Sequence, residues 1–277
     1  MKPFHFLSAL ALASAALVAC GNVDEQDRFD GPFEAAVQKN VLIEDFTGQR
    51  CSNCPLATEK IHEMQEAFGK EHIVAVAIHG GALGVSETDK PAIGLANEQG
   101  EQLYSYWKVE TQPNGLVDRV GGLKDFAEWM GAAVPRLYQT PKVQLAATAS
   151  VDEATRQLSL QVSATATEDL QGKLQVWLTE SNLVRIQTLP AEWGGGNQKD
   201  YVHNHVLRHV LTPAYGEVVS ADAEGHATWT ATYDVPKVYG KGSKTNLIMM
   251  HVVAFVTNDE TGEVLQVVEA PLAPMIN

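Results

Sequence analysis

Hydrophobic positions in the N-terminal half of the chain alternate between continuous runs and a helical spacing. Residues 41–46 and 72–78 are apolar runs of strand length and rich in β-branched side chains, which predicts buried strands in a sheet covered on both faces. Between them lies one apolar helix face, formed by Ile61, Met64, Ala67 and Phe68. Gly69 ends that helix, and a second helix is predicted over residues 92–107. The pattern indicates a β-α-β arrangement.

The C-terminal half changes to alternating or short apolar segments joined by turn-like sequences. The predicted strands cover residues 144–151, 158–165, 174–178, 227–233, 247–256 and 264–268. Six or seven strands over about 130 residues are typical of a β-sandwich of the immunoglobulin or fibronectin type III kind. The fold class predicted for the whole chain is therefore an α/β domain followed by an all-β sandwich.

A C-x-x-C motif, Cys51-Ser52-Asn53-Cys54, lies between the first predicted strand and the first helix. This spacing places both sulfurs within one turn at the helix N-terminus, where unpaired N–H groups and the helix dipole stabilise a thiolate. Arg50 adds a neighbouring positive charge. Cys51 is predicted to be the more exposed nucleophile and Cys54 the resolving thiol of a thiol-disulfide exchange.

Two other interpretations of the cysteine pair stay open. The pair could form a static structural disulfide, although so short a loop gives little stabilisation. It could also be half of a zinc site, but the chain has no second C-x-x-C, and His62 and His72 lack ligand spacing. No metal or other cofactor is predicted.

The first domain resembles thioredoxin from the C-x-x-C to the segment around Pro113. An aromatic residue and a valine precede Pro113, and a strand and the Gly121-Gly122 turn follow it. The resemblance implies that Pro113 follows a cis peptide bond and packs against the cysteine pair, while Gln112 binds substrate backbone. Arg50, beside the first cysteine, is also predicted to bind substrate. The chain lacks both the Trp before the first cysteine and the Pro between the two.

The same resemblance implies a buried acid six residues before the first cysteine, at Asp45. Glu44 is its neighbour, and only one of two adjacent residues on a strand can face the cysteines. Asp45 is the predicted catalytic acid. The alternative is that both carboxylates lie at a wet strand end.

The N-terminus has a positively charged start and an apolar stretch too short to span a bilayer, as in a signal peptide. Leu17-Val18-Ala19-Cys20 resembles a bacterial lipobox, which implies lipidation of Cys20 and anchoring to the outer membrane. The predicted organisation is a signal peptide (1–19), a lipidated flexible tether (20–36), a thioredoxin-like domain (37–138) and a β-sandwich domain (139–277).

Charge limits the classes of partner. The 277 residues carry a formal net charge of −14, and no basic stretch interrupts this balance, so nucleic acid is not an expected partner. The expected contacts are the membrane, through lipid on Cys20, and envelope or surface client proteins.

A histidine-rich segment, Y-V-H-N-H-V-L-R-H, covers residues 201–209. His203 and His205 are expected to share one face of a strand, but no local carboxylate or sulfur completes a metal site. We favour a polar strand or loop in which His203, His205 and Arg208 dock against the first domain or a protein partner.

The lipobox, the strand ending in E-D-F-T-G, the C-S-N-C-P motif and the Y-V-H-N-H-V-L-R segment together resemble the outer-membrane-protein-28-related lipoprotein family of Gram-negative envelopes. The resemblance implies a thioredoxin-like and an immunoglobulin-like domain on an outer-membrane lipoprotein, at the periplasmic face or the cell surface. Two functions follow from the sequence. One is thiol-disulfide exchange on envelope or surface proteins, and the other is a non-catalytic surface adhesin or binding lipoprotein with a static Cys51–Cys54 bond.

Overall fold

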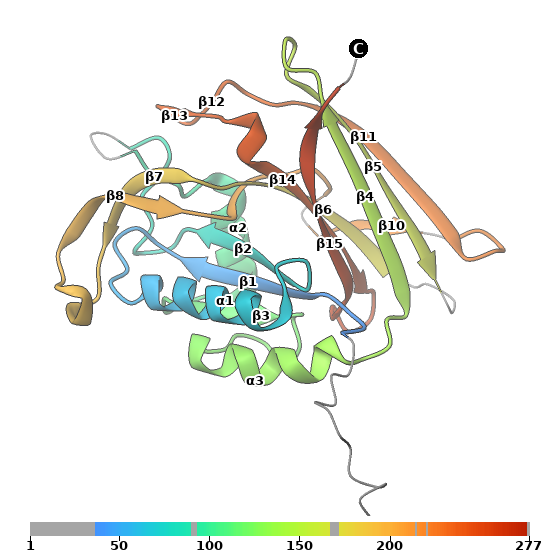
Figure 1. The fold of residues 1–277 in the computed structure, drawn as a ribbon, viewed down its shortest axis with the longest axis horizontal. Helices are drawn as coiled ribbons and strands as arrows, with labels where there is room; N and C mark the ends of the chain where they lie inside the picture. The colour runs from blue at the N-terminus through green and yellow to red at the C-terminus, as the bar shows by residue number, and fades with distance from the viewer. Residues whose placement is uncertain (1–36, 90–92, 167–171, 214, 220, 276–277) are drawn as a thin grey trace, which may run out of the picture. The chain divides into compact units, whose positions relative to one another are not determined.

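The computed structural model describes residues 37–89, 93–166, 172–213, 215–219 and 221–275 (Figure 1). The predicted signal peptide, tether and lipidated Cys20 lie outside these residues. Within the described part, residues from Val37 onward form one compact unit. The chain order of the elements is β1 (Val41–Thr47), α1 (Cys54–Phe68), β2 (Ile73–His79), α2 (Glu98–Trp107), β3 (Asn114–Val117), α3 (Phe126–Leu137), β4 (Val143–Val151), β5 (Gln157–Ala166), β6 (Gly172–Glu180), β7 (Leu183–Thr188), β8 (Asn197–His203), β9 (Val206–Val210), β10 (Glu217–Val219), β11 (His226–Asp234), β12 (Val238–Tyr239), β13 (Ser243–Lys244), β14 (Met250–Asn258) and β15 (Val264–Pro274).

The N-terminal elements form where the hydrophobic pattern predicts them. β1 and β2 are parallel, joined through α1, and β3 is antiparallel to β1. Residues of β1 alternate between two cores: Val41 and Ile43 pack against α1 and α3, while Leu42 and Phe46 pack on the opposite face. Burial on both faces explains the continuous apolar run. The second predicted helix is shorter than expected, because α2 begins only at Glu98, where Asn97 caps it through the backbone N–H of Gly100.

The large sheet does not end at β2. Ala77 of β2 lies in register with Val206 of β9, and the backbone N–H of Ala77 donates to the carbonyl of His205 at 2.8 Å. From β9 the sheet continues through β6, β14, β15, β4 and β5 to β11, in the order β11-β5-β4-β15-β14-β6-β9-β2-β1-β3, with β10 also paired to β6.

The predicted fold class, a thioredoxin-like α/β domain followed by an immunoglobulin-like or fibronectin-like sandwich, is therefore wrong. The protein is mostly β, and a single mixed sheet runs through both halves of the chain. The physical reason is that β2 leaves an edge of unpaired backbone groups, and β9 from the second half satisfies them. Most of the individual strands were nevertheless predicted from their hydrophobic pattern.

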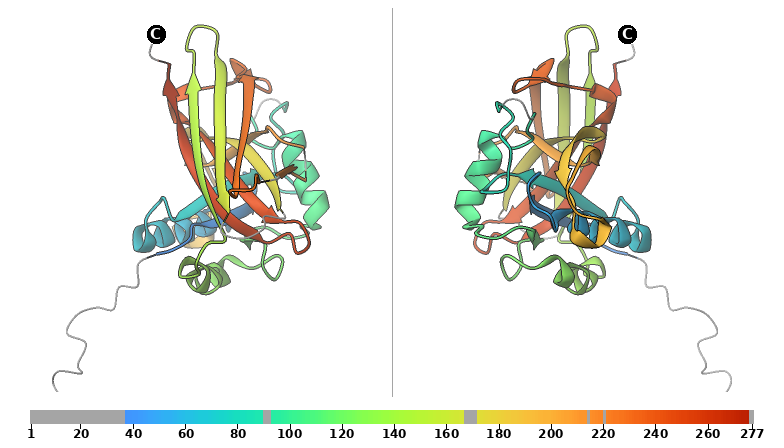
Figure 2. Two further views of the ribbon diagram at one scale, coloured as in Figure 1. Left: turned by 90° about the vertical axis from the view of Figure 1, so that its right-hand side faces the viewer. Right: turned by 90° about the vertical axis from the view of Figure 1, so that its left-hand side faces the viewer.

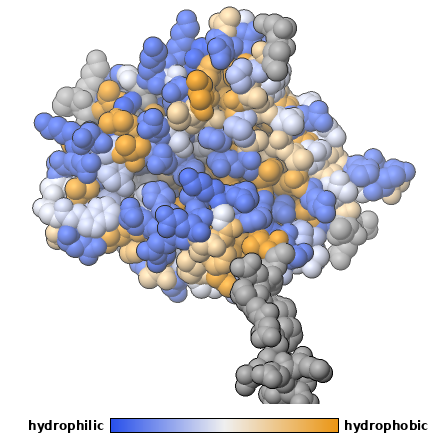
Figure 3. All heavy atoms as spheres, in the orientation of Figure 1, coloured by the Kyte–Doolittle hydropathy of each residue, from blue (hydrophilic) through white to orange (hydrophobic). Residues whose placement is uncertain are grey.

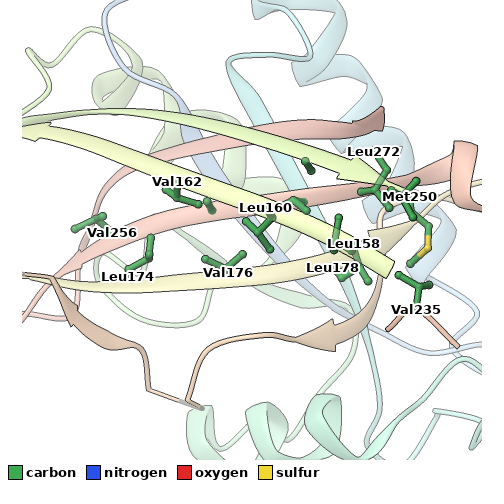
Figure 4. Packing of buried hydrophobic residues seen from close by; sticks show 14 of the residues in the cluster. Leu158, Leu160, Val162, Leu174, Val176, Leu178, Val235, Met250, Val256 and Leu272 are labelled. Carbon is green, nitrogen blue, oxygen red and sulfur yellow. The ribbon is translucent and has the colours of Figure 1, made fainter. Parts of the chain in front are cut away.

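The C-terminal part of the sheet curls at β15. The first part of this strand pairs with β14, whereas residues 272–274 pair with β4. This bend brings β5 opposite β6, and the space between them is filled by an apolar core that includes Leu158, Leu160, Val162, Leu174, Val176, Leu178, Met250 and Val256 (Figure 4). Strand alternation decides which residues of β5 enter this core.

A separate hairpin of β7 and β8 extends from the sheet, and the right-hand view of Figure 2 shows it beside α1 and β1. No helix among the described residues is long and apolar enough to cross a membrane. On the face shown in Figure 3, hydrophilic and hydrophobic residues are interspersed.

Candidate functional site

The two cysteines of the C-x-x-C motif form a disulfide. β1 ends at Thr47, a short loop follows, and α1 begins at Cys54 with Pro55 in its first turn. Pro suits this position because its missing N–H would be unpaired there in any case. The Cα atoms of Cys51 and Cys54 are 5.4 Å apart. The sequence prediction that these two residues form a pair at the helix N-terminus is confirmed.

The disulfide is buried. Cys51 is 1% exposed and Cys54 is 2% exposed, whereas Ser52 and Asn53 between them are exposed. The more exposed Cys51 that the sequence predicted is thus covered in this structure. Part of its surroundings comes from the second half of the chain, where Gln187 donates to the carbonyl of Cys51, and the local sequence around the motif could not reveal this contact.

The β7–β8 hairpin covers the cysteine loop and is hydrogen-bonded to it. The side-chain amide of Gln187 donates to the carbonyl of Cys51 at 2.8 Å and to that of Gly48 at 3.3 Å. The backbone N–H of Thr188 donates to the carbonyl of Gln49 at 2.9 Å, and the Gln49 side chain donates back to the carbonyl of Ile186 at 3.1 Å. Gln187 and Gln49 are both buried. Backbone and amide groups of loop and hairpin therefore satisfy one another.

A second loop, residues 80–84, packs against the other side of the cysteine loop. The backbone N–H of Arg50 donates to the carbonyl of Leu83 at 2.9 Å. A Cβ atom on Gly48 would lie 2.6 Å from that same carbonyl oxygen, so the close approach requires glycine. The side chain of Arg50 itself is exposed.

Asp45 and Glu44 face opposite sides of the sheet. Asp45 is buried and lines the same small cavity as Cys54, which is the side that the sequence analysis favoured. Glu44 lies on the other side, where its two carboxylate oxygens accept hydrogen bonds from Arg119 at 2.7 and 2.8 Å. Burial raises the pKa of Asp45 to about 8. With this pKa Asp45 is mostly protonated at neutral pH and half-ionised near pH 8, so it can release or accept a proton close to Cys54.

The cavity beneath the disulfide has a volume of about 20 Å³ and is enclosed by β1, β2, α1 and the β7–β8 hairpin. Its polar lining includes Asp45, His79, Tyr201 and His203. The ring centroids of His79 and His203 are 5.2 Å apart, and those of Tyr201 and His203 are 4.9 Å apart. A space of this size has room for about one water molecule, so the groups can exchange protons but cannot enclose a substrate.

Burial keeps both histidines neutral. It lowers the pKa of His203 to about 4, and it lowers the pKa of His79 well below the usual histidine range, with His203 and Arg208 adding to the effect on His79. Among the described residues, Oδ1 of Asp45, Nδ1 of His79 and Nε2 of His203 have no hydrogen-bond partner. Three buried polar atoms without partners around one cavity are unusual in a folded protein.

The peptide bond between Gln112 and Pro113 is cis, as the resemblance to thioredoxin predicted, and Pro113 is buried. The side chain of Gln112 holds neighbouring loops together. Its amide nitrogen donates to the carbonyl of Gly80 at 3.1 Å and to the Tyr104 hydroxyl at 2.5 Å, and its oxygen accepts from the backbone N–H of Leu83 at 3.2 Å. The substrate-binding role of Gln112 and Arg50 stays a prediction.

The histidine-rich segment divides between two strands. His203 ends β8, and His205 lies in the turn to β9 with a positive φ of 55°, so the expected shared strand face is wrong. Arg208 is buried, 3.2 Å from a Glu180 oxygen and over the ring of Tyr239. His209 stacks on Tyr233. The described residues contain no cluster of three metal-ligating side chains.

The sequence analysis missed several residues of the site. His79 directly follows the second apolar run, and in the structure it pairs with Thr47 at the end of β1. The predicted β-α-β arrangement was the available signal, because it places the ends of both strands at the same edge of the sheet, beside the cysteine loop. Gln49, Gln187 and Tyr201 carried no signal, because their roles depend on the hairpin folding over the loop.

Comparison with known proteins decides the family. Residues 100–274 match the family model described as outer membrane protein Omp28. The chain belongs to the Omp28 family of outer membrane proteins. The family resemblance found in the sequence is thereby confirmed. No curated protein matches the chain.

Three solved structures resemble this Omp28-family protein. HBP35 of Porphyromonas gingivalis has 16% sequence identity and a TM-score of 0.67 over 87% of this chain and 78% of that one, so the two share a fold. A protein from Agrobacterium tumefaciens has 13% identity and a TM-score of 0.47 over 87% of this chain and 97% of that one. A domain of the outer membrane lipoprotein Omp28 from Porphyromonas gingivalis has 20% identity and a TM-score of 0.34 over 50% of this chain and 93% of that one.

Proposed function

We propose that this protein is a non-catalytic binding lipoprotein of the outer membrane and that the Cys51–Cys54 disulfide is a static bond. The observation that carries the proposal is the burial of both cysteines beneath the β7–β8 hairpin. Thiol-disulfide exchange begins with in-line attack of an external thiolate on one sulfur. A pair that is 1% and 2% exposed gives such a thiolate no access in this conformation.

A static bond has a use at this position. It fixes the loop whose carbonyl groups, from Gly48 and Cys51, accept hydrogen bonds from Gln187 of the hairpin. The bond therefore restricts the conformation of the cysteine loop to which the hairpin is hydrogen-bonded. This local effect matters more than its constraint on the unfolded chain, since the closed loop is very short.

The hairpin also carries exposed apolar side chains that suit protein binding. Val184 and Val202 lie opposite each other on β7 and β8 and are 47% and 41% exposed. Trp193, in the connection between the two strands, is 41% exposed. Val184 and Val202 thus form one exposed apolar pair and Trp193 a second exposed apolar site on the same hairpin, and exposed apolar surface of this kind is found where proteins contact a partner. The class of partner we propose is an envelope or surface protein.

The reduction potential of the disulfide tests the static bond. The folded protein is equilibrated in thiol redox buffers, and free thiols are counted by mass after alkylation. A static bond predicts a potential below about −300 mV, and a value well above this would overturn the proposal.

Two matched variants distinguish protection of the disulfide by the β7–β8 hairpin from general destabilisation of the protein. Gln187→Ala removes the hydrogen bonds to the cysteine loop, whereas Gln65→Ala removes a buried amide that donates to the carbonyl of Ile73, away from the disulfide. Faster reduction in Gln187→Ala than in both wild type and Gln65→Ala supports protection by the hairpin. Equal rates in all three proteins contradict it.

Binding through the hairpin is tested with a photo-crosslinking residue at position 184. The control places the same residue at Val218 on β10, which is exposed but belongs to another part of the sheet. Defined adducts with the same envelope protein from position 184, and their absence from position 218, support binding by the hairpin. Equal labelling from both positions indicates non-specific contact.

Thiol-disulfide exchange is a second candidate function, favoured by the position of Asp45. A buried carboxyl with its pKa raised to about 8 lines the cavity that Cys54 also lines, as required of a group whose carboxylate form accepts the proton of a resolving thiol. In this case a dithiol donor of the envelope first reduces the Cys51–Cys54 bond and is itself oxidised to a disulfide. The hairpin opens to admit the client, and the Cys51 thiolate attacks the client disulfide, which releases one client sulfur as a thiolate. Cys54 then attacks Cys51 in the mixed disulfide and releases the second client sulfur, so the client leaves as a dithiol and the pair returns to the disulfide. Cys54→Ala then accumulates mixed disulfides with envelope proteins, and Cys51→Ala does not.

We also propose lipid attachment at Cys20, on the evidence of the lipobox-like sequence alone. Several acyl chains on one residue are enough for stable anchoring. Wild-type protein should then enter the detergent phase in a phase-partition assay, and Cys20→Ala should stay in the aqueous phase. Detergent-phase recovery of the variant equal to that of wild type contradicts the assignment.

A further inference from the structure

Strand β11 lies at one end of the large sheet, and within the described part of the chain it pairs with β5 alone. The left-hand view of Figure 2 shows it as the outer strand beside β5. Its register with β5 runs from His226 to Asp234 without a shift. A long, regular edge strand presents a row of backbone N–H and C=O groups to any strand that approaches it.

Strand β11, all of whose residues are described, lacks the usual sequence features that protect an edge strand. Natural proteins place Lys, Pro, a bulge or a very short strand at a sheet edge to prevent pairing. Residues 227–233 read A-T-W-T-A-T-Y and contain neither charge nor proline. The opposite end of the sheet differs, because β3 is only four residues long and Gly115 exchanges backbone hydrogen bonds with Lys124.

We propose that β11 pairs antiparallel with β11 of a second copy of this chain, about a two-fold axis at Thr230. The sequence H-A-T-W-T-A-T-Y-D is self-complementary in this register. Thr228 meets Thr232 of the second copy, and Trp229 meets Ala231. Each large side chain lies opposite a small one, and Thr–Thr pairs are favourable across antiparallel strands.

The ends of the strand add complementary histidine and carboxylate side chains. The same register places Ala227 opposite Tyr233, and His226 opposite Asp234 of the second copy. A shift by one residue would place Trp229 opposite Thr230 and separate the His–Asp pairs. An imidazole N–H of His226 can donate a hydrogen bond to the Asp234 carboxylate across the pair, and such cross-strand side-chain pairs stabilise a sheet. A two-fold contact uses the same surface on both copies, so this self-complementarity is the property that a symmetric dimer requires.

The two faces of β11 are compatible with a continuous sheet across the axis. Ala227, Trp229, Ala231 and Tyr233 pack on the core side and are half-buried, while the threonines on the other face are exposed. In the paired sheet, Trp229 and Tyr233 of one copy would lie on the same face as Trp229 and Tyr233 of the second copy, so that the apolar face continues across the axis. It would also bury the free backbone groups of the edge without changing the fold of either copy.

Cysteine crosslinking tests the register. In the full chain, Thr230→Cys places the thiols at position 230 of the two copies opposite each other. Their Cα atoms would be about 4.5–5.5 Å apart, a separation that a disulfide can bridge. Thr228→Cys is the matched control on the same face, because in this register position 228 of one copy lies opposite Thr232 of the second copy. The two introduced thiols are therefore not opposite each other. The double variant Thr228→Cys/Thr232→Cys should crosslink again. Wild type gives the background, and all four proteins are oxidised in their membranes and separated on non-reducing gels.

The proposal predicts a covalent dimer for Thr230→Cys and for the double variant, with Thr228→Cys at the wild-type background. Crosslinking of Thr228→Cys as efficient as that of Thr230→Cys would indicate random collision or another register and overturn the proposal. Crosslinks to a different protein in place of the dimer would show that the edge takes another partner and would overturn the proposal. The absence of any crosslink would also overturn it, provided that circular dichroism shows each variant folded.

Discussion

The clearest quantitative prediction concerns Asp45. Its carboxyl group is buried, and Oδ1 has no hydrogen-bond partner among the described residues, so the folded protein favours the protonated form. In the unfolded chain the same group has its ordinary pKa of 3.8, whereas in the folded protein the pKa is about 8. The folded state therefore binds one more proton than the unfolded state between these two values.

The sign and size follow from proton linkage. Each pH unit between the two pKa values changes the free energy of unfolding by about 1.4 kcal/mol. Because the folded pKa is raised, stability is lost as the pH rises, and the loss is complete above pH 8. The whole effect is about 6 kcal/mol, and about 3 kcal/mol of it is present at pH 6.

Asp45→Asn removes this dependence. The amide is similar in size and stays neutral, so its own burial changes stability by the same amount at every pH. We expect the free energy of unfolding of Asp45→Asn minus that of wild type to grow steadily from pH 4 to pH 8. Urea unfolding followed by circular dichroism at several pH values measures it. The contribution of the buried histidines cancels in the difference.

A flat difference across this pH range would refute the reasoning. It would mean that Asp45 is as well solvated in the folded protein as in the unfolded one and that the cavity admits water freely. Asp89→Asn removes an exposed carboxylate and serves as the control for substitution itself.

Three further predictions concern stability. Replacing both Cys51 and Cys54 by Ala should lower the free energy of unfolding by only about 2 kcal/mol, because the closed loop is short; loss of folding at room temperature would contradict this. Glu44→Ala leaves the buried Arg119 without its carboxylate and should cost about 3–5 kcal/mol in urea unfolding; a cost below about 1 kcal/mol would show that the pair is solvated. His203, with a folded pKa of about 4, contributes stability that is lost as the pH falls below 6.5, by about 3 kcal/mol at pH 4; His203→Gln should lack this loss.

The Glu44 prediction has a matched control on the surface. Lys60 and Glu63 form an ion pair on the exposed side of α1. Glu63→Ala should change stability by less than about 1 kcal/mol, since water screens an exposed pair.

The candidate site shows where sequence reasoning succeeds and where it fails. The disulfide and its position at the start of α1 were predictable, because four consecutive residues and the helix that follows them determine it. The cis bond before Pro113 was predictable only through resemblance to thioredoxin. The choice of Asp45 over Glu44 rested on strand alternation combined with that resemblance. The burial of Cys51 was not predictable, since Gln187 lies 136 residues away along the chain.

The sequence by itself determined the local elements, the cysteine pair and the family, because hydrophobic periodicity and short motifs act over a few residues. Only the tertiary structure decided that β9 joins β2, that the sheet curls at β15, and that the β7–β8 hairpin covers the disulfide. The strand pairings are made by backbone N–H and C=O groups, which are the same in every residue type except proline, and the hairpin is held by side-chain amides of Gln49 and Gln187 that reach distant carbonyl groups. The sequence therefore gives little indication of which distant strand pairs with a sheet edge. For this reason the hydrophobic pattern predicted two domains, whereas the structure has one continuous sheet.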